Sequence, residues 1–144
     1  MITLQQYFGG RRTTHSTECS PNIEDNALRT VAIVNDLLAN CARFGVVPPI
    51  NPGGDFAGSQ LNSGWRPPSI NTCTAGASPT SMHMTGEAVD LHDPAGELDA
   101  FLMTPEGQFL LTDLGIWMES PDKTPGWCHV QTRPPKSGNR VFVP

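Results

Sequence analysis

The stretch SMHMTGEAVD, residues 81–90, holds the densest group of chemically reactive residue types in the chain. Within it His83 and Asp90 stand seven positions apart, with Gly86 between them. The pattern over residues 86–91 predicts a short strand, which places the histidine on the loop before the strand and the aspartate on the strand itself. Because a glycine joins the two parts, His83 and Asp90 can both face one cation.

A second histidine follows in GWCHV, residues 126–130, where His129 stands 39 positions after Asp90. A lone histidine is more often a surface or hydrogen-bonded side chain than a ligand, so the prediction depends on the combination. Two imidazoles and one carboxylate leave a fourth zinc position for water, as a catalytic zinc site requires. Cys128 is the neighbour of His129 on a predicted strand, so we expect it to face the other way and not to bind the metal.

The remaining pattern predicts an α+β fold, in which helices pack on a small antiparallel sheet. Apolar residues recur at steps of three and four over residues 23–44, which predicts one long amphipathic helix, with Asn22 as its cap and Gly45 at its end. Weaker signals predict shorter helices over 98–103 and 104–113, and strands over 61–65, 86–91, 116–119 and 127–131.

Length and composition narrow the class of protein. A chain of 144 residues is the size of one domain, 1–144. Its net charge of −5 argues against a nucleic-acid partner, because an unselective binder of polyanions is basic. No apolar run is long enough for membrane insertion or for a signal peptide. A monomer is the expected oligomeric state. The four cysteines form no CxxC pair, and we expect buried thiols rather than disulfides.

The paired motifs resemble those of the zinc D-alanyl-D-alanine peptidases, a family that shares its fold with hedgehog signalling domains. The resemblance lies in S-x-H-x-x-G-x-A-x-D of residues 81–90 and W-x-H of residues 127–129, and SGWRP of residues 63–67 resembles the family's preceding segment. It extends over a core of about residues 22–132. It implies a hedgehog/DD-peptidase-like fold that holds one Zn²⁺ per chain, bound by His83, Asp90 and His129.

The resemblance also implies catalytic and substrate-binding residues. Several branches of the family place the glutamate that acts as general base three residues before the last zinc histidine, but Gly126 stands there in this chain. Glu119, at the end of the preceding predicted strand, is the better candidate. Whether it faces the same side as His129 depends on a strand register that the sequence leaves open. Arg66 and Ser81 match family residues that contact or adjoin the substrate, and a guanidinium fork suits a peptide carboxylate.

The expected function is hydrolysis of peptide bonds in bacterial peptidoglycan, with a D,D-bond of the stem or cross-link as the first candidate. A short chain without a signal peptide resembles the phage-encoded members, which are made in the host cytoplasm and act on the cell wall after release by a holin-type route. Two alternatives stay open. One is an L-alanyl-D-glutamate endopeptidase on the same fold, and the other is a non-catalytic, zinc-stabilised binding module, which the missing acid at position 126 favours.

Overall fold

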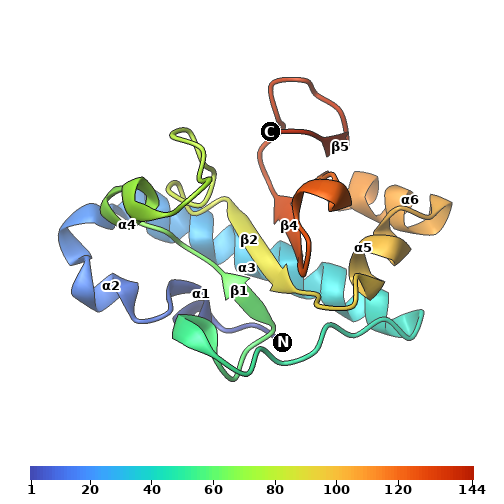
Figure 1. The fold of residues 1–144 in the computed structure, drawn as a ribbon, viewed down its shortest axis with the longest axis horizontal. Coiled ribbons are helices and arrows are strands. Elements are labelled where there is room, and N and C mark those ends of the chain that lie inside the picture. Colours follow the sequence, from blue (N-terminus) through green and yellow to red (C-terminus); the bar gives the residue numbers. More distant parts are fainter.

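A five-stranded sheet with the strand order β1-β2-β4-β3-β5 forms the centre of the computed structural model, which describes residues 1–144 (Figure 1). Every neighbouring pair is antiparallel except β3 and β5, which are parallel. The predicted α+β class is therefore confirmed, while the short parallel edge strand was not predicted. The strands are β1 (Leu61–Ser63), β2 (Ala88–His92), β3 (Trp117–Glu119), β4 (Trp127–Gln131) and β5 (Val141–Phe142).

The long predicted helix is present as α3 (Pro21–Arg43), which runs behind β2 and β4 in Figure 1. Its start differs from the prediction, because Ser20 rather than Asn22 is the N-cap. The Ser20 side chain accepts a hydrogen bond from the Ile23 amide. Pro21 then occupies the first helical position, where its missing N–H costs nothing.

Five shorter helices surround the sheet, and three of them lie in segments for which no helix was predicted. The helix expected over residues 104–113 is confirmed with Thr104 as its N-cap, whose side chain accepts from the Gly107 amide. The shorter helices are α1 (Leu4–Phe8), α2 (Arg11–Thr14), α4 (Pro68–Cys73), α5 (Glu97–Leu102) and α6 (Pro105–Asp113). Three single 3₁₀ turns lie in the connections between elements, at Ser16–Glu18, Gly54–Phe56 and Pro121–Lys123.

The apolar core lies between α3 and one face of the sheet, where alternate strand residues such as Val89, Leu91 and Val130 are fully buried. The N-terminal segment belongs to this packing, although the resemblance covered only residues from about 22. Tyr7 is fully buried and its hydroxyl donates to the Ala88 carbonyl at 3.0 Å. Because alternate residues of a strand point to opposite faces, the even-numbered neighbours on β2 are left free to build a site on the other face.

The cysteines are all unpaired, and they differ in exposure. Cys41 and Cys128 are buried, as expected, whereas Cys73 is exposed on α4 and Cys19 is partly buried. No helix in the structure combines the length and the apolar character that a membrane crossing needs.

Candidate metal centre

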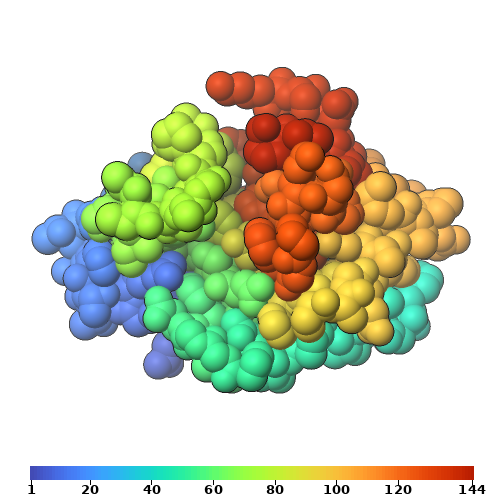
Figure 2. All heavy atoms as spheres, in the orientation of Figure 1, coloured from blue at the N-terminus to red at the C-terminus, as the bar shows by residue number.

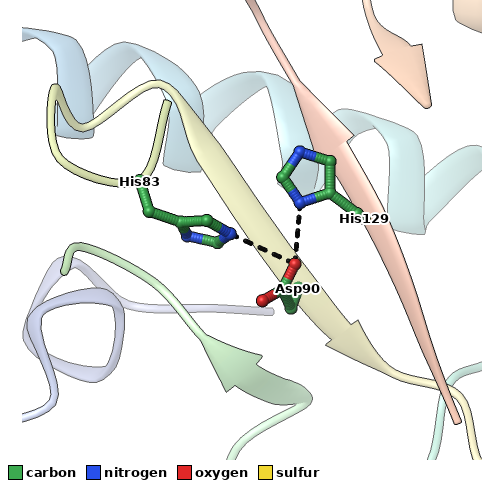
Figure 3. Close-up of side chains that lie close together, drawn as sticks. All are labelled: His83, Asp90 and His129. Carbon is green, nitrogen blue, oxygen red and sulfur yellow. Dashed lines mark hydrogen bonds and ion pairs between the residues drawn. The ribbon is translucent and has the colours of Figure 1, made fainter. Parts of the chain in front are cut away.

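Three predicted ligands come together in the structure: His83, Asp90 and His129 (Figure 3). Their donor atoms lie within 4.8 Å of one another. Asp90 Oδ1 is 3.2 Å from His83 Nε2 and 2.8 Å from His129 Nδ1. The side chains of His83, Asp90 and His129 are only 3%, 13% and 10% exposed. This buried group could hold a metal ion.

The pairing of β2 with β4 explains how two of these ligands meet. Asp90 and His129 are register partners across the two strands, so their side chains leave the same face of the sheet side by side. Val89 and Cys128, one position earlier on each strand, point into the core on the opposite face. Cys128 thus points away from His83, Asp90 and His129 (the ligand group), as expected from strand alternation.

The third ligand is positioned by the turn before β2, which rests on helix α3. Gly86 has a φ of +79°, and a Cβ at this position would lie 2.7 Å from the Ile23 carbonyl oxygen of α3. Two side chains of α3 bind the turn: Thr30 donates to the Gly86 carbonyl at 2.9 Å, and Asn26 donates to that of Thr85 at 3.0 Å. Gly86 therefore provides close contact with the helix, not the flexibility suggested by its sequence context.

The hydrogen bond of His83 fixes which ring nitrogen faces Asp90. His83 Nδ1 is 2.7 Å from the carbonyl oxygen of Gly64, which can only accept a hydrogen bond. Nδ1 must therefore carry the proton, and in the neutral ring Nε2 presents a lone pair to the carboxylate. The Nε2 lone pair of His83 and the Oδ1 atom of Asp90 therefore face each other 3.2 Å apart. Both atoms carry negative charge density, so a cation bound between them would stabilise this arrangement.

Charge coupling inside the group is strong. Burial opposes ionisation of Asp90, but the two imidazoles next to it hold the pKa of this carboxyl well below its usual range. Burial by itself would lower the pKa of His129, yet the Asp90 carboxylate and the nearby Glu119 raise it. The site thus carries an ionised acid and favours positive charge beside it, which is the electrostatic character of a cation site.

The register of β3 with β4 answers the question that the sequence left open about Glu119. Trp117 pairs with Gln131 and Met118 with Val130, so Glu119 and His129 lie on the same face of the sheet. Glu119 is partly buried, and burial raises the pKa of its carboxyl; the charges of Asp90 and Asp122 raise it further, while His129 partly offsets them.

Arg66 and Ser81 also lie together beside this group. The Arg66 guanidinium donates to Ser81 Oγ at 3.1 Å and to Asn71 Oδ1 at 2.9 Å. The Arg66 amide donates to the carbonyl of His83, which ties the arginine to the ligand loop. Burial lowers the pKa of Arg66, and the charge of Asp90 raises it, so the guanidinium lies within electrostatic range of the ligand group.

The molecular surface is indented on the face that Figure 2 shows. Figure 2 shows a hollow between the light-green segment around residues 70–80 and the orange and red segments beyond residue 120. Strand β2 passes between these two walls in Figure 1. Asp90 lies on this strand.

Two residues near the site have contacts that were not predicted. Glu87 forms an ion pair with Arg133 at 3.0 Å and accepts a hydrogen bond from Thr85 at 2.6 Å. The sequence reasoning also missed Gln131, whose Oε1 is 3.3 Å from His129 Nε2. Its position two residues after His129 on a predicted strand was the available signal, because residues i and i+2 share a face.

Comparison with protein-family models, with curated proteins and with solved structures finds no match for this chain. The function therefore has to be argued from the residues and their arrangement.

Proposed function

We propose that the protein is a zinc-dependent peptidase that hydrolyses peptide bonds of bacterial peptidoglycan, with a D,D-bond of the stem or cross-link as its first substrate. The observation that supports this most is the buried His83–Asp90–His129 group, with Glu119 on the same face of the sheet. The choice of peptidoglycan follows from the resemblance of the motifs around these residues to the D-alanyl-D-alanine peptidases.

The donor set fits zinc. Two imidazole nitrogens and one carboxylate oxygen are typical of catalytic zinc sites, and three protein ligands leave one position open. A zinc ion held by His83, Asp90 and His129 would lower the pKa of a water molecule and polarise the scissile carbonyl. The burial of the group and the fixed tautomer of His83 mean that these ligands need little rearrangement to bind the ion.

Glu119 supplies the proton transfer in this proposal. Its carboxylate accepts a proton from the attacking water and later delivers it to the leaving amine. The raised pKa of Glu119 brings its proton affinity closer to that of the groups with which it exchanges protons. Gly126 has a φ of +93°, a conformation that a glutamate rarely adopts. In this proposal the carboxylate that other family members carry at the position of Gly126 is therefore supplied by Glu119 on β3.

Arg66 and Ser81 bind and orient the substrate. The Arg66 guanidinium is held by Asn71 and Ser81, so its planar fork is in place before a ligand arrives. A peptide carboxylate can then accept two parallel hydrogen bonds from it. Substrate binding is thus assigned to residues beside His83, and proton transfer to a residue on the same face as His129. A peptide held by Arg66 would extend across the His83–Asp90–His129 group towards Glu119.

The test is a digest of purified peptidoglycan by the protein as a monomeric chain, with and without a zinc chelator, followed by mass spectrometry of the products. The Glu119→Gln variant with full zinc content is the matched control. We expect chelator-sensitive release of peptides by the wild type only. New termini at the D,D-bond support the proposal, and new termini between L-alanine and D-glutamate identify the alternative endopeptidase. One bound zinc without any product favours a zinc-stabilised binding module.

A lysis enzyme of this kind would be made in the host cytoplasm and would reach the cell wall after a holin-type partner opens the membrane. This part of the proposal rests on the resemblance to phage-encoded peptidases. Expression in the host with and without such a pore checks it, because lysis should require both components.

A further inference from the structure

We infer that Gln131 is a positioning residue for the metal centre, because it keeps the ring of His129 in the tautomer whose Nδ1 can bind the ion. The inference rests on the proposed metal site and assigns a role to a residue outside the ligand set. Gln131 is 6% exposed and lies on β4, two positions after His129 on the same face.

The orientation of the Gln131 amide follows from its second contact. Gln131 Nε2 donates to the carbonyl oxygen of Arg133 at 2.6 Å. The opposite orientation would bring two carbonyl oxygens together at this distance, and both can only accept. The amide is therefore held with Oε1 towards His129, 3.3 Å from Nε2.

Two acceptors compete for the single proton of a neutral His129 ring. Asp90 Oδ1, 2.8 Å from Nδ1, favours the tautomer with a proton on Nδ1. Gln131 Oε1 favours the tautomer with a proton on Nε2. Only the second tautomer presents an Nδ1 lone pair to an ion that Asp90 also binds. Gln131 thus favours the His129 tautomer that can bind the ion, whereas Asp90 favours the other tautomer.

The tautomer of His83 is fixed in the same way, but by a main-chain carbonyl instead of a side chain. The carbonyl of Gly64 accepts the proton of His83 Nδ1 and leaves Nε2 for the ion. Each imidazole of the centre therefore has one outer acceptor, which is the usual support of a metal-binding histidine. Of the two acceptors, only Gln131 is a side chain, so only this one can be removed by a substitution.

The test compares Gln131→Leu, which removes both amide contacts at similar volume, with Gln131→Glu. The glutamate also loses the hydrogen bond to the Arg133 carbonyl, but it keeps an acceptor that can face His129. Gln108→Leu is the control, because Gln108 Nε2 donates to the Leu102 carbonyl at 2.7 Å away from the ligand group. Zinc affinity is measured by competition with a chromophoric chelator, and the Tm of each metal-free protein is recorded. Long-range ¹H–¹⁵N NMR of the zinc-loaded protein identifies the protonated nitrogen of His129.

We expect Gln131→Leu to weaken zinc binding by about 10- to 100-fold. Its metal-free Tm should fall no further than that of Gln108→Leu, and Gln131→Glu should bind zinc within a few-fold of the wild type. The wild-type spectrum should show the His129 proton on Nε2. If Gln131→Leu does not fold, the role of Gln131 is tested by the zinc affinity of Gln131→Glu and by the protonated nitrogen of His129 in the wild-type spectrum.

Two negative results have different meanings. A wild type that binds no zinc overturns the metal centre itself, and the role of Gln131 with it. A wild type that binds zinc, with Gln131→Leu of equal affinity or with the His129 proton on Nδ1, overturns only the role of Gln131.

Discussion

Asp90 and His129 are partners across the antiparallel pair of β2 and β4, with Asp90 Oδ1 2.8 Å from His129 Nδ1. This contact joins residues 39 positions apart in sequence, and the register of two short strands determines it. The third member, His83, enters from the turn that Gly86 holds against α3. Removing a proposed ligand, the proposed proton-transfer group, the proposed substrate anchor or the glycine of the turn should therefore have separable effects.

His83→Ala should lose zinc and peptidase activity together. Loss of a ligand should weaken zinc binding by more than about 100-fold, because loss of an outer hydrogen-bond partner already costs 10- to 100-fold. The measurement is zinc content by atomic emission beside the rate of peptide release. His15→Ala is the control, since the His15 ring is hydrogen-bonded only to the neighbouring Thr14 in the structure. Stoichiometric zinc in His83→Ala would contradict the ligand assignment.

Glu119→Gln should keep zinc and lose turnover. A general base contributes about 10²- to 10⁴-fold, so kcat should fall in that range while KM changes little. Glu106→Gln, at an exposed position of α6, should behave as the wild type. Unchanged turnover in Glu119→Gln would remove this residue from the mechanism.

Arg66→Met should raise KM and spare the metal. The lost charge-assisted hydrogen bonds are worth about 1.5–3 kcal/mol, which corresponds to a fall in kcat/KM of about 10- to 100-fold. Steady-state kinetics with zinc content measured in parallel check this, and Arg29→Met on the exposed side of α3 is the control. An unaltered kcat/KM would count against Arg66 as the substrate anchor.

Gly86→Ala should destabilise the protein and weaken metal binding. The added Cβ meets the Ile23 carbonyl of α3, and its φ of +79° is strained for alanine, so we expect a loss of about 2–4 kcal/mol in the free energy of unfolding. Gly138 also has a positive φ, +70°, but no atom lies within 4 Å of an added Cβ. Gly138→Ala therefore isolates the backbone strain, and equal losses in the two variants would show that contact with α3 is unimportant.

Asp99→Asn should change how stability depends on pH. Asp99 is 6% exposed and its Oδ1 has no hydrogen-bond partner. Burial, with the charge of Asp93, raises its pKa to about 6, while the thiol of Cys128 partly offsets this. The folded state therefore binds this proton more tightly than the unfolded state, and the wild type should lose stability as pH rises from the unfolded pKa towards about 6.

Asparagine carries no such charge, so Asp99→Asn should be more stable than the wild type at pH 7 by about 3 kcal/mol. The difference should vanish as the pH falls below the pKa of an unfolded aspartate, about 4. Urea unfolding at several pH values measures it. Asp36→Asn, at an exposed position of α3, is the control. A difference that does not depend on pH would contradict the raised pKa of Asp99.

The sequence by itself determined the parts of this protein that depend on local patterns. The period of apolar residues predicted α3, and weaker local signals predicted the strand at 127–131 and the helix at 104–113, which correspond to β4 and α6. These features arise from interactions within one turn or one strand, so neighbouring residues specify them. The ligand types were also readable, because histidine is scarce and its spacing from Asp90 is distinctive.

The tertiary structure alone decided how the residues of the site face one another and what holds them in place. The faces of Glu119 and His129 depend on strand register, and a shift of one residue would have turned the glutamate to the other side. The tautomer of His83 depends on a carbonyl 19 residues away, and the need for Gly86 arises from the approach of α3. Such contacts join distant parts of the chain, and local preferences carry no information about them, because they form only when the core packs.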